Sequence, residues 1–219
     1  MASRFTITVL VVFAASAWFL FLLAQGGDVG LDFFKPATFV VGLLSTTLWG
    51  FEKWVWRWSW VNRFLKRPNL TGTWCGTLAS NYVPKDHVSP VPPINVALVI
   101  HQSFTSLDLR LLTTESESES IATDLAPLPA GRYSITGLYR NEPGLSARND
   151  SPIHYGGLRL NLQGEDLKRL AGQYWTDRGT QGELELSLVA RTEATDYQMA
   201  SELNARTSGA EDPVQSADV

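Results

Sequence analysis

The stretch Glu183-Leu-Glu-Leu-Ser-Leu188 alternates polar residues with leucine. A period of two is typical of a β-strand that has one face on a core and the other in water. Runs of similar character recur back to Pro68, separated by Gly, Pro, Asn, Asp or Ser. We predict eight strands, at Thr71–Ala79, Asn95–Ser103, Leu107–Thr114, Ser116–Leu125, Arg132–Asn141, His154–Leu162, Leu170–Thr176 and Glu183–Ala190.

These strands belong to one all-β domain at residues 68–191, since no part of that range has the pattern of a long amphipathic helix. Eight antiparallel strands suit a small up-and-down, lipocalin-like β-barrel, whose interior has room for side chains or one small ligand. A β-sandwich is the main alternative. Residues 192–219 carry six acids and one arginine with little apolar content, so we expect an acidic, disordered tail.

The N-terminal part has a different composition. Residues 5–27 contain no charge over 23 positions, and a second uncharged run covers residues 36–51. The first run is long enough to cross a bilayer. The second is followed by tryptophans at 54, 56, 58 and 60, as in an interfacial aromatic belt.

We therefore predict that residues 1–67 form a transmembrane hairpin and a juxtamembrane linker, with spans at about 5–24 and 36–56. A cleaved signal peptide is the alternative for the first span, and a buried core helix is the alternative for the second.

The charges are divided unevenly along the chain. Residues 1–67 carry seven Lys/Arg and three Asp/Glu, whereas residues 68–219 carry eleven and nineteen. The basic residues flank the outer ends of the hairpin, so the positive-inside rule places the N-terminus and the β-domain in the cytoplasm. A part of the chain as acidic as residues 68–219 lacks the broad basic surface that sequence-independent binding to polymeric nucleic acid requires.

Signatures of catalysis and metal binding are missing from the sequence. It has no Walker or dinucleotide-type glycine loop, no His-Glu-x-x-His and no Gly-x-Ser-x-Gly. The single Cys75 excludes an intramolecular disulfide framework, and the histidines at 87, 101 and 154 lack metal-ligand spacing. His101 is expected in the barrel wall. We expect a binding module, with no enzymatic activity, no metal and no cofactor.

Neutral hydrogen-bonding residues are concentrated in the β-domain. Thr114, Ser116, Ser118 and Ser120 share one parity of a strand, and glutamates occupy the other. If the glutamates face water, the hydroxyls face inward, where they need either cross-strand partners or a polar ligand. Both possibilities are open from the sequence.

A second group of candidates lies at strand ends and in one hairpin. Tyr139 and Asn141 share a face, and His154 begins a strand. The hairpin at residues 172–182 combines aromatic, hydroxyl and arginine side chains, which can stack on a base and pair with a phosphate. Trp175 is equally compatible with a core plug, and Arg178 with a hairpin salt bridge. The candidate ligand-binding residues are Thr114, Ser116, Ser118, Tyr139, Asn141, His154, Tyr174, Trp175, Arg178 and Thr180.

Several of these motifs occur in an order that resembles a known family. They are Leu70-Thr-Gly-Thr-Trp-Cys-Gly76, Ile100-His-Gln102, Thr114-Glu-Ser-Glu-Ser-Glu-Ser120, Tyr139-Arg-Asn-Glu-Pro143, His154-Tyr-Gly156 and the Tyr174–Gly182 hairpin. Together with two N-terminal spans, they resemble the two-transmembrane, β-strand-rich effectors of bacterial CBASS anti-phage immunity. The resemblance extends from residue 1 to about residue 191, and the acidic tail lies outside it.

The resemblance implies an expected function. The cytoplasmic barrel would bind a cyclic oligonucleotide, here expected to be a cyclic dinucleotide, that is made by a cGAS-like nucleotidyltransferase. The hairpins would then self-associate in the lipid of the bacterial inner membrane and disrupt it, which leads to abortive infection. A membrane-tethered lipocalin-like carrier and a non-enzymatic membrane adaptor are the alternatives.

Overall fold

The computed structural model describes residues 12, 15, 16, 19, 31–58, 60, 61, 65, 67–83, 88–146, 148, 151–164 and 166–210, with the backbone alone at 31–40 and 209–210. Most of the first predicted span therefore lies outside the described residues. The chain divides into two compact units, Met1–Asn69 with Ser103–Ser106 and Leu70–Gln102 with Leu107–Val219.

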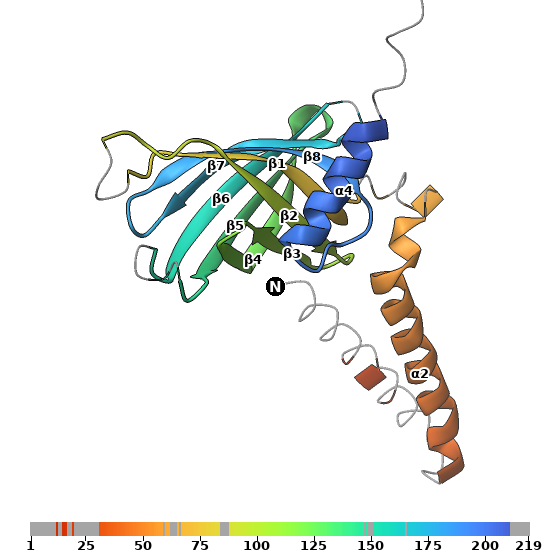
Figure 1. The fold of residues 1–219 in the computed structure, drawn as a ribbon. Helices are drawn as coiled ribbons and strands as arrows, with labels where there is room; N and C mark the ends of the chain where they lie inside the picture. Colours follow the sequence, from red (N-terminus) through yellow and green to blue (C-terminus); the bar gives the residue numbers. More distant parts are fainter. Residues whose placement is uncertain are drawn as a thin grey trace, which may run out of the picture. The chain divides into compact units, whose positions relative to one another are not determined.

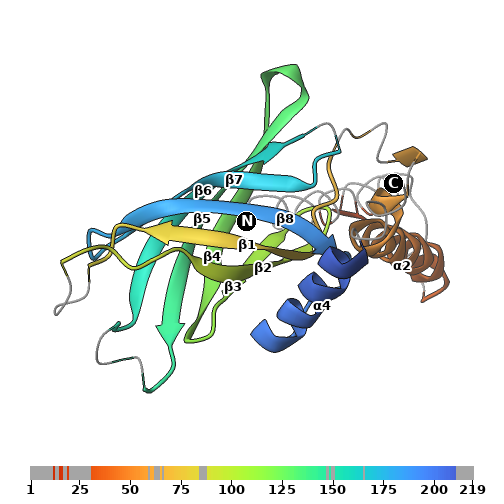
Figure 2. The ribbon, with the colours of Figure 1, turned by 45° about the horizontal axis from the view of Figure 1, so that its top comes forward.

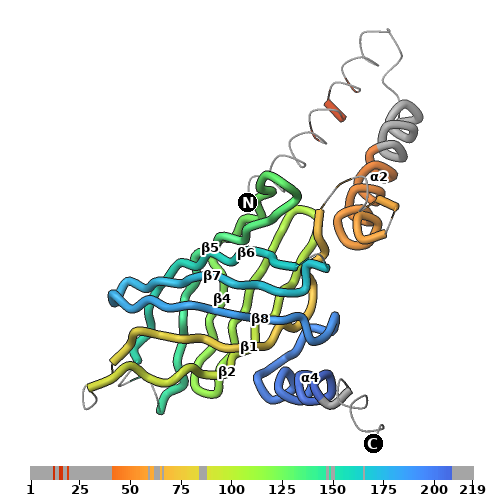
Figure 3. Tube along the Cα trace, turned by 90° about the horizontal axis from the view of Figure 1, so that it is seen from above, coloured from red at the N-terminus to blue at the C-terminus, as the bar shows by residue number. Residues whose placement is uncertain are grey.

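The larger unit is an eight-stranded closed barrel (Figure 1). Every strand pairs antiparallel with the next, and the last pairs with the first, so the predicted up-and-down barrel is confirmed and the sandwich is wrong. Figure 3 shows neighbouring strands of this order side by side. The strands are β1 (Gly72–Ser80), β2 (Ile94–Gln102), β3 (Leu107–Leu112), β4 (Ser116–Leu128), β5 (Arg132–Pro143), β6 (His154–Gln163), β7 (Arg169–Thr176) and β8 (Gln181–Ala190).

Alternation along the strands separates the interior from the outer wall. In β5, Tyr139 and Asn141 are buried whereas Arg140 and Glu142 are exposed. The register of β4 against β5 shifts between Ser120 and Ala122, as at a β-bulge.

One end of the barrel is closed by a packed plug. Trp74 and Leu70 are almost fully buried, and the Trp74 indole Nε1 donates to the Leu70 carbonyl at 2.9 Å. The Leu70 amide in turn donates to Oε1 of the buried Gln102 at 2.7 Å. Because these polar groups are paired with each other, they can lie inside the apolar end without a large desolvation cost.

Helix α4 (Tyr197–Ala210) corrects the prediction of a disordered tail for most of that segment. It packs on the outer wall of β8, β1 and β2 (Figure 2). Its N-terminus is capped by Asp196, whose Oδ1 accepts from the Met199 amide at 2.9 Å. Ala200 is fully buried against an apolar patch that includes Cys75. The prediction of disorder used the low average apolar content of the whole tail. A few apolar residues with helical spacing are nevertheless enough to dock a helix on such a patch. Residues 211–219 lie outside the described part.

The segment before α4 is also held against the barrel wall. The Thr73 hydroxyl donates to the Thr192 carbonyl at 2.7 Å and accepts from the Ala194 amide at 2.9 Å. The Arg110 guanidinium donates to the carbonyls of Ala194 and Thr195 at 2.7 and 2.8 Å. These bonds fix the chain at the point where it leaves β8.

The smaller unit contains helix α2 (Leu31–Lys53), the 3-10 turn η1 (Val55–Arg57) and the loop Ser103–Ser106. The Glu52 carboxylate accepts from the Ser103 hydroxyl at 2.6 Å and from the Thr105 amide at 3.2 Å. Helix α2 covers most of the second predicted span. In the part of the chain that the structure describes, no helix combines the length and the apolar character that a membrane crossing needs. The membrane hairpin therefore stays a prediction.

Candidate functional site

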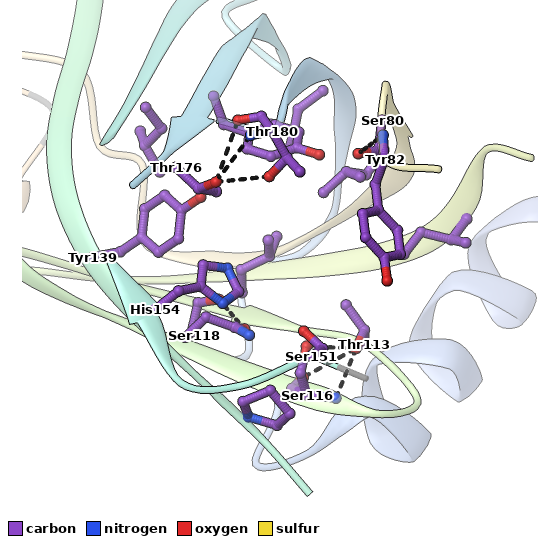
Figure 4. Close-up of a pocket in the computed structure, with 18 of the residues that line it drawn as sticks. Ser80, Tyr82, Thr113, Ser116, Ser118, Tyr139, Ser151, His154, Thr176 and Thr180 are labelled. Carbon is purple, nitrogen blue, oxygen red and sulfur yellow. Dashed lines mark hydrogen bonds between the residues drawn. The ribbon is translucent and has the colours of Figure 1, made fainter. Parts of the chain in front are cut away.

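A cavity of about 460 Å³ opens at the barrel end opposite the Trp74 plug. Its floor is lined by leucines of the barrel core, namely Leu98, Leu109, Leu158, Leu160 and Leu184. Its mouth is lined by polar residues from the strand ends and from the β1–β2, β3–β4, β5–β6 and β7–β8 connections (Figure 4). An apolar floor below a polar rim is a common arrangement for a site that binds a small molecule.

The predicted hydroxyl row from β4 lines this cavity. Ser118 is buried and its hydroxyl donates to Oδ1 of Asn141 at 2.7 Å. The Ser120 hydroxyl accepts from the Leu109 amide at 2.9 Å, and the Ser116 hydroxyl lies 3.1 Å from that of Thr113. The row thus has protein partners. Each hydroxyl can still make further bonds, because it carries one donor and two acceptor sites. Thr114 also lines the mouth, in the turn after β3.

Strands β5 and β6 contribute Tyr139, Asn141 and His154 to the same cavity. Asn141 and His154 are direct cross-strand partners, and Tyr139 is paired with Gly156. Because Gly156 has no side chain, the ring of Tyr139 occupies the space beside it: a Cβ added there would lie 2.4 Å from the tyrosine hydroxyl oxygen. The glycine therefore makes room for an aromatic wall of the cavity.

The β7–β8 hairpin supplies Tyr174, Arg178 and Thr180. The turn is closed by the Thr176 amide, which donates to the Thr180 carbonyl at 2.9 Å, and Gly179 adopts the positive φ of 76° that the turn needs. The hydroxyls of Thr176 and Thr180 lie 2.7 Å apart. This turn places Arg178 at the mouth.

Trp175 is the one predicted site residue that does not line the cavity. It is 48% exposed on the outer wall, and its ring lies over Gly157, its cross-strand partner. Successive side chains of a strand point to opposite faces, so Tyr174 and Trp175 cannot both face inward. Trp175 therefore neither lines the cavity nor fills the core, and both predicted positions of this side chain are wrong.

The electrostatics of the cavity are set by few charges. Arg178 is the one Lys or Arg, and Glu115 the one Asp or Glu, among the described lining residues. Burial lowers the pKa of His154, and Arg178 lowers it further, while the hydrogen bond to the Pro152 carbonyl and the Asp177 carboxylate oppose these shifts. Burial raises the pKa of Tyr139 and of Tyr174, so both phenols stay neutral.

The guanidinium of Arg178 is held loosely by its neighbours. Its Nη1 donates to the Ser151 hydroxyl at 3.3 Å, and its Cζ lies 6.0 Å from the centre of the Tyr82 ring. Both of these contacts are with uncharged side chains. A loosely held arginine at a cavity mouth can turn toward an anion at low cost.

The sequence interpretation missed several lining residues, including Ser80, Tyr82, Thr113 and Ser151. Ser80 follows Leu78 at period two and could have been found by continuing β1 by one residue. Tyr82 and Ser151 lie in connections, where no periodicity exists to place a side chain. His101 is outside the cavity: it is exposed, and its Nδ1 lies 3.0 Å from Glu193.

The comparison with known families concerns the barrel. Residues 65–187, more than half of the chain, match the family described as Cap15, cyclic dinucleotide receptor domain. The chain belongs to this family. A curated relative, CD-NTase-associated protein 15 from Staphylococcus schleiferi, is 29% identical over 137 residues, which cover 63% of this chain and 70% of the relative.

Membership of the Cap15 receptor family confirms the resemblance to CBASS effectors that the motifs indicated. The family match ends within β8, so helix α4 lies beyond it. Among the described residues, no cluster of His, Cys, Asp and Glu is arranged to hold a metal ion.

Proposed function

We propose that this chain is a CBASS anti-phage effector that binds a cyclic dinucleotide second messenger in the barrel cavity. The observation that carries the proposal is the cavity of a Cap15-family barrel with Arg178 at its polar mouth and leucines at its floor. A base can enter between apolar and aromatic walls, and a phosphate can pair with the arginine.

The charge of the site is compatible with this ligand. A cyclic dinucleotide carries two phosphodiester charges, whereas the lining contributes one arginine. The second phosphate would then be bound by neutral donors such as the hydroxyls of Ser116 and Thr180 and the amide of Asn141. Neutral hydrogen-bond donors in a partly buried site bind anions without the basic surface that polymeric nucleic acid requires.

The downstream part of the proposal rests on the N-terminal sequence. Two hydrophobic spans at about 5–24 and 36–56 would anchor the chain in the bacterial inner membrane, with the barrel in the cytoplasm. Ligand would favour self-association of the barrels, raise the local concentration of the hairpins and so disrupt the membrane. A cGAS-like nucleotidyltransferase would supply the ligand. In this scheme the chain acts as a receptor and effector, and not as an enzyme.

The test is a binding screen on the full chain. Thermal unfolding is followed with cyclic di-AMP, cyclic di-GMP, mixed cyclic GMP–AMP and a cyclic trinucleotide, with linear dinucleotides as controls. A ligand that binds only the folded state raises the unfolding temperature with its concentration. Stabilisation by a cyclic dinucleotide, and not by its linear form, supports the proposal. Stabilisation by an apolar ligand alone would favour the lipocalin-like carrier.

A further inference from the structure

His154 lines the cavity, and one of its two ring nitrogens, Nδ1, is already hydrogen-bonded to the protein. Its Nδ1 is 3.0 Å from the Pro152 carbonyl oxygen. A carbonyl can only accept, so Nδ1 carries the ring proton. In the neutral ring Nε2 then has a lone pair and no proton. Among the described residues no protein donor bonds to Nε2, and the residue lines the cavity.

The surroundings of the ring favour this neutral state. His154 is 8% exposed, and burial of an imidazole disfavours its charged form. Among the residues that the structure describes, the charged groups that act on the ring are Arg178 and Asp177, both from the β7–β8 turn. Glu115 lines the mouth from the β3–β4 turn, and the neutral Tyr139 from β5 lies beside the ring in Figure 4. The adjacent guanidinium further disfavours an imidazolium.

We propose that His154 is a specificity residue whose Nε2 accepts a hydrogen bond from a neutral donor of the ligand, while the phosphates are left to Arg178 and to hydroxyl and amide donors. This inference rests on the proposed function. The donor is a ribose hydroxyl or a base N–H group, since both present the same chemistry to a lone pair. A phosphate oxygen has no hydrogen to donate, so it cannot bind the neutral Nε2.

The two possible roles of His154 predict opposite pH dependences. If Nε2 accepts, protonation removes the lone pair, and affinity falls as the pH is lowered. If the ring contacts a phosphate, protonation creates a donor and a charge, and affinity rises as the pH is lowered. Because the pKa of His154 is below its ordinary value of 6.5, the change occurs below that pH, and affinity is constant above neutrality.

The experiment measures the dissociation constant of the full chain for the cyclic dinucleotide that binds best in the screen, from pH 5 to pH 8. We expect weakening on the order of tenfold toward the acid end. His154→Gln removes the titrating group and should make the affinity independent of pH. His101→Gln is the matched control, because His101 is exposed on the outer wall, and this variant should retain the wild-type profile. Thermal unfolding at each pH verifies that the barrel is folded.

Ligand analogues distinguish the two donors. Replacing the ribose 2′-hydroxyls by hydrogen should weaken binding to the wild type but not to His154→Phe if the donor is a ribose hydroxyl. If the donor is a base N–H, the same difference appears instead with a base analogue that lacks it.

Tighter binding at low pH would overturn the proposal, and so would normal affinity in His154→Phe. Failure of every cyclic dinucleotide to bind would overturn the proposed function, and this inference with it, whereas binding with the wrong pH trend rejects this inference alone.

Discussion

Tyr139 lies directly across from Gly156, and a Cβ on Gly156 would come within 2.4 Å of the tyrosine hydroxyl oxygen and 2.6 Å of the Trp175 carbonyl oxygen. The same arrangement recurs on the outer wall, where the Trp175 ring covers Gly157. A ring that packs over a cross-strand glycine stabilises a position where the strand otherwise lacks a side chain. The position of the Tyr139 ring in the cavity therefore depends on residue 156 having no side chain.

Substituting Gly156 by alanine should disturb both the fold and the cavity. The new methyl group must move Tyr139 or the β7 backbone, and such overpacking costs about 1–3 kcal/mol. We expect a lower unfolding temperature and weaker binding of cyclic dinucleotide. Gly144→Ala is the control, since its Cβ would make an ordinary 3.5 Å contact with the Glu115 carbonyl oxygen. Equal stability of the two variants would show that the Tyr139 ring is not confined by Gly156.

Arg178→Ala tests the charge at the mouth. Loss of a charge-assisted phosphate contact should weaken ligand binding by about 2–3 kcal/mol. The fold should be unaffected, because the side chain makes only a 3.3 Å bond to Ser151 and a distant contact with Tyr82. Isothermal titration of the variant, compared with Arg169→Ala on the outer wall, measures the effect. Unchanged affinity in a folded Arg178→Ala protein would remove Arg178 from the site.

Trp175→Ala tests the position of this residue outside the cavity. Its ring packs on Gly157, so its loss should lower stability by about 1 kcal/mol. Ligand affinity should stay within about twofold of the wild type, since no part of the residue lines the cavity. Denaturant unfolding and a binding titration on the same sample separate the two effects. A large loss of affinity at wild-type stability would instead mean that the outer wall takes part in binding.

Cys75 reports whether helix α4 is docked. It is the single cysteine of the chain, it lies beneath α4, and burial raises its pKa to about 11. At pH 8 about one thiol in a thousand is then a thiolate, so alkylation should be slow. Ala200→Glu places a charge in the α4 contact and should speed labelling by about tenfold or more. The exposed Ser201→Glu is the matched control. Fast labelling of the wild type would contradict stable docking.

The raised pKa of the Cys75 thiol also means that the stability of the fold should decrease as the pH rises above 9. Its folded pKa of about 11 is above the ordinary value of 9.0. The folded state therefore holds this proton more tightly than the unfolded state, and the stability that results is present below pH 9 and is lost as the pH rises toward 11. Cys75→Ser removes this contribution, and its unfolding free energy should fall less steeply over the same range.

The barrel was predictable from the sequence because its strands alternate cleanly, as in Glu183 to Leu188. The same parity placed Ser116, Ser118 and Tyr139 at one cavity. The alternation of polar and apolar residues ends where the chain leaves the sheet. Tyr82 lies in the β1–β2 connection, so the pattern could not place its side chain in the cavity.

Helix α4 was missed for another reason. Its docking depends on apolar residues of the barrel's outer wall, such as Val99, which are far away in sequence. The sequence of the tail alone therefore does not predict that the helix docks. The apolar Val99 on the outer wall of the barrel was a signal, because a side chain of this kind is usually buried by another element.

The link between the cavity and the membrane can be tested in cells. We expect the full chain, produced with a nucleotidyltransferase that makes the bound cyclic dinucleotide, to stop growth and to admit propidium. Arg178→Ala should do neither, because it binds the ligand weakly, and a ligand shifts assembly only by binding the assembled state more tightly than the unassembled one. Residues 68–219 should also be harmless, since they lack both predicted spans.

The controls identify which step fails. A catalytically inactive nucleotidyltransferase should abolish the effect, and immunoblots verify equal amounts of each protein. If the full chain is equally toxic without nucleotide, the N-terminal segment is a poorly tolerated anchor, and ligand control is excluded. If nucleotide binds to the full chain but the membrane stays sealed, the barrel is a receptor whose output is not membrane disruption. In that case a carrier or adaptor role would follow, and the binding results for Arg178 and His154 would stand unchanged.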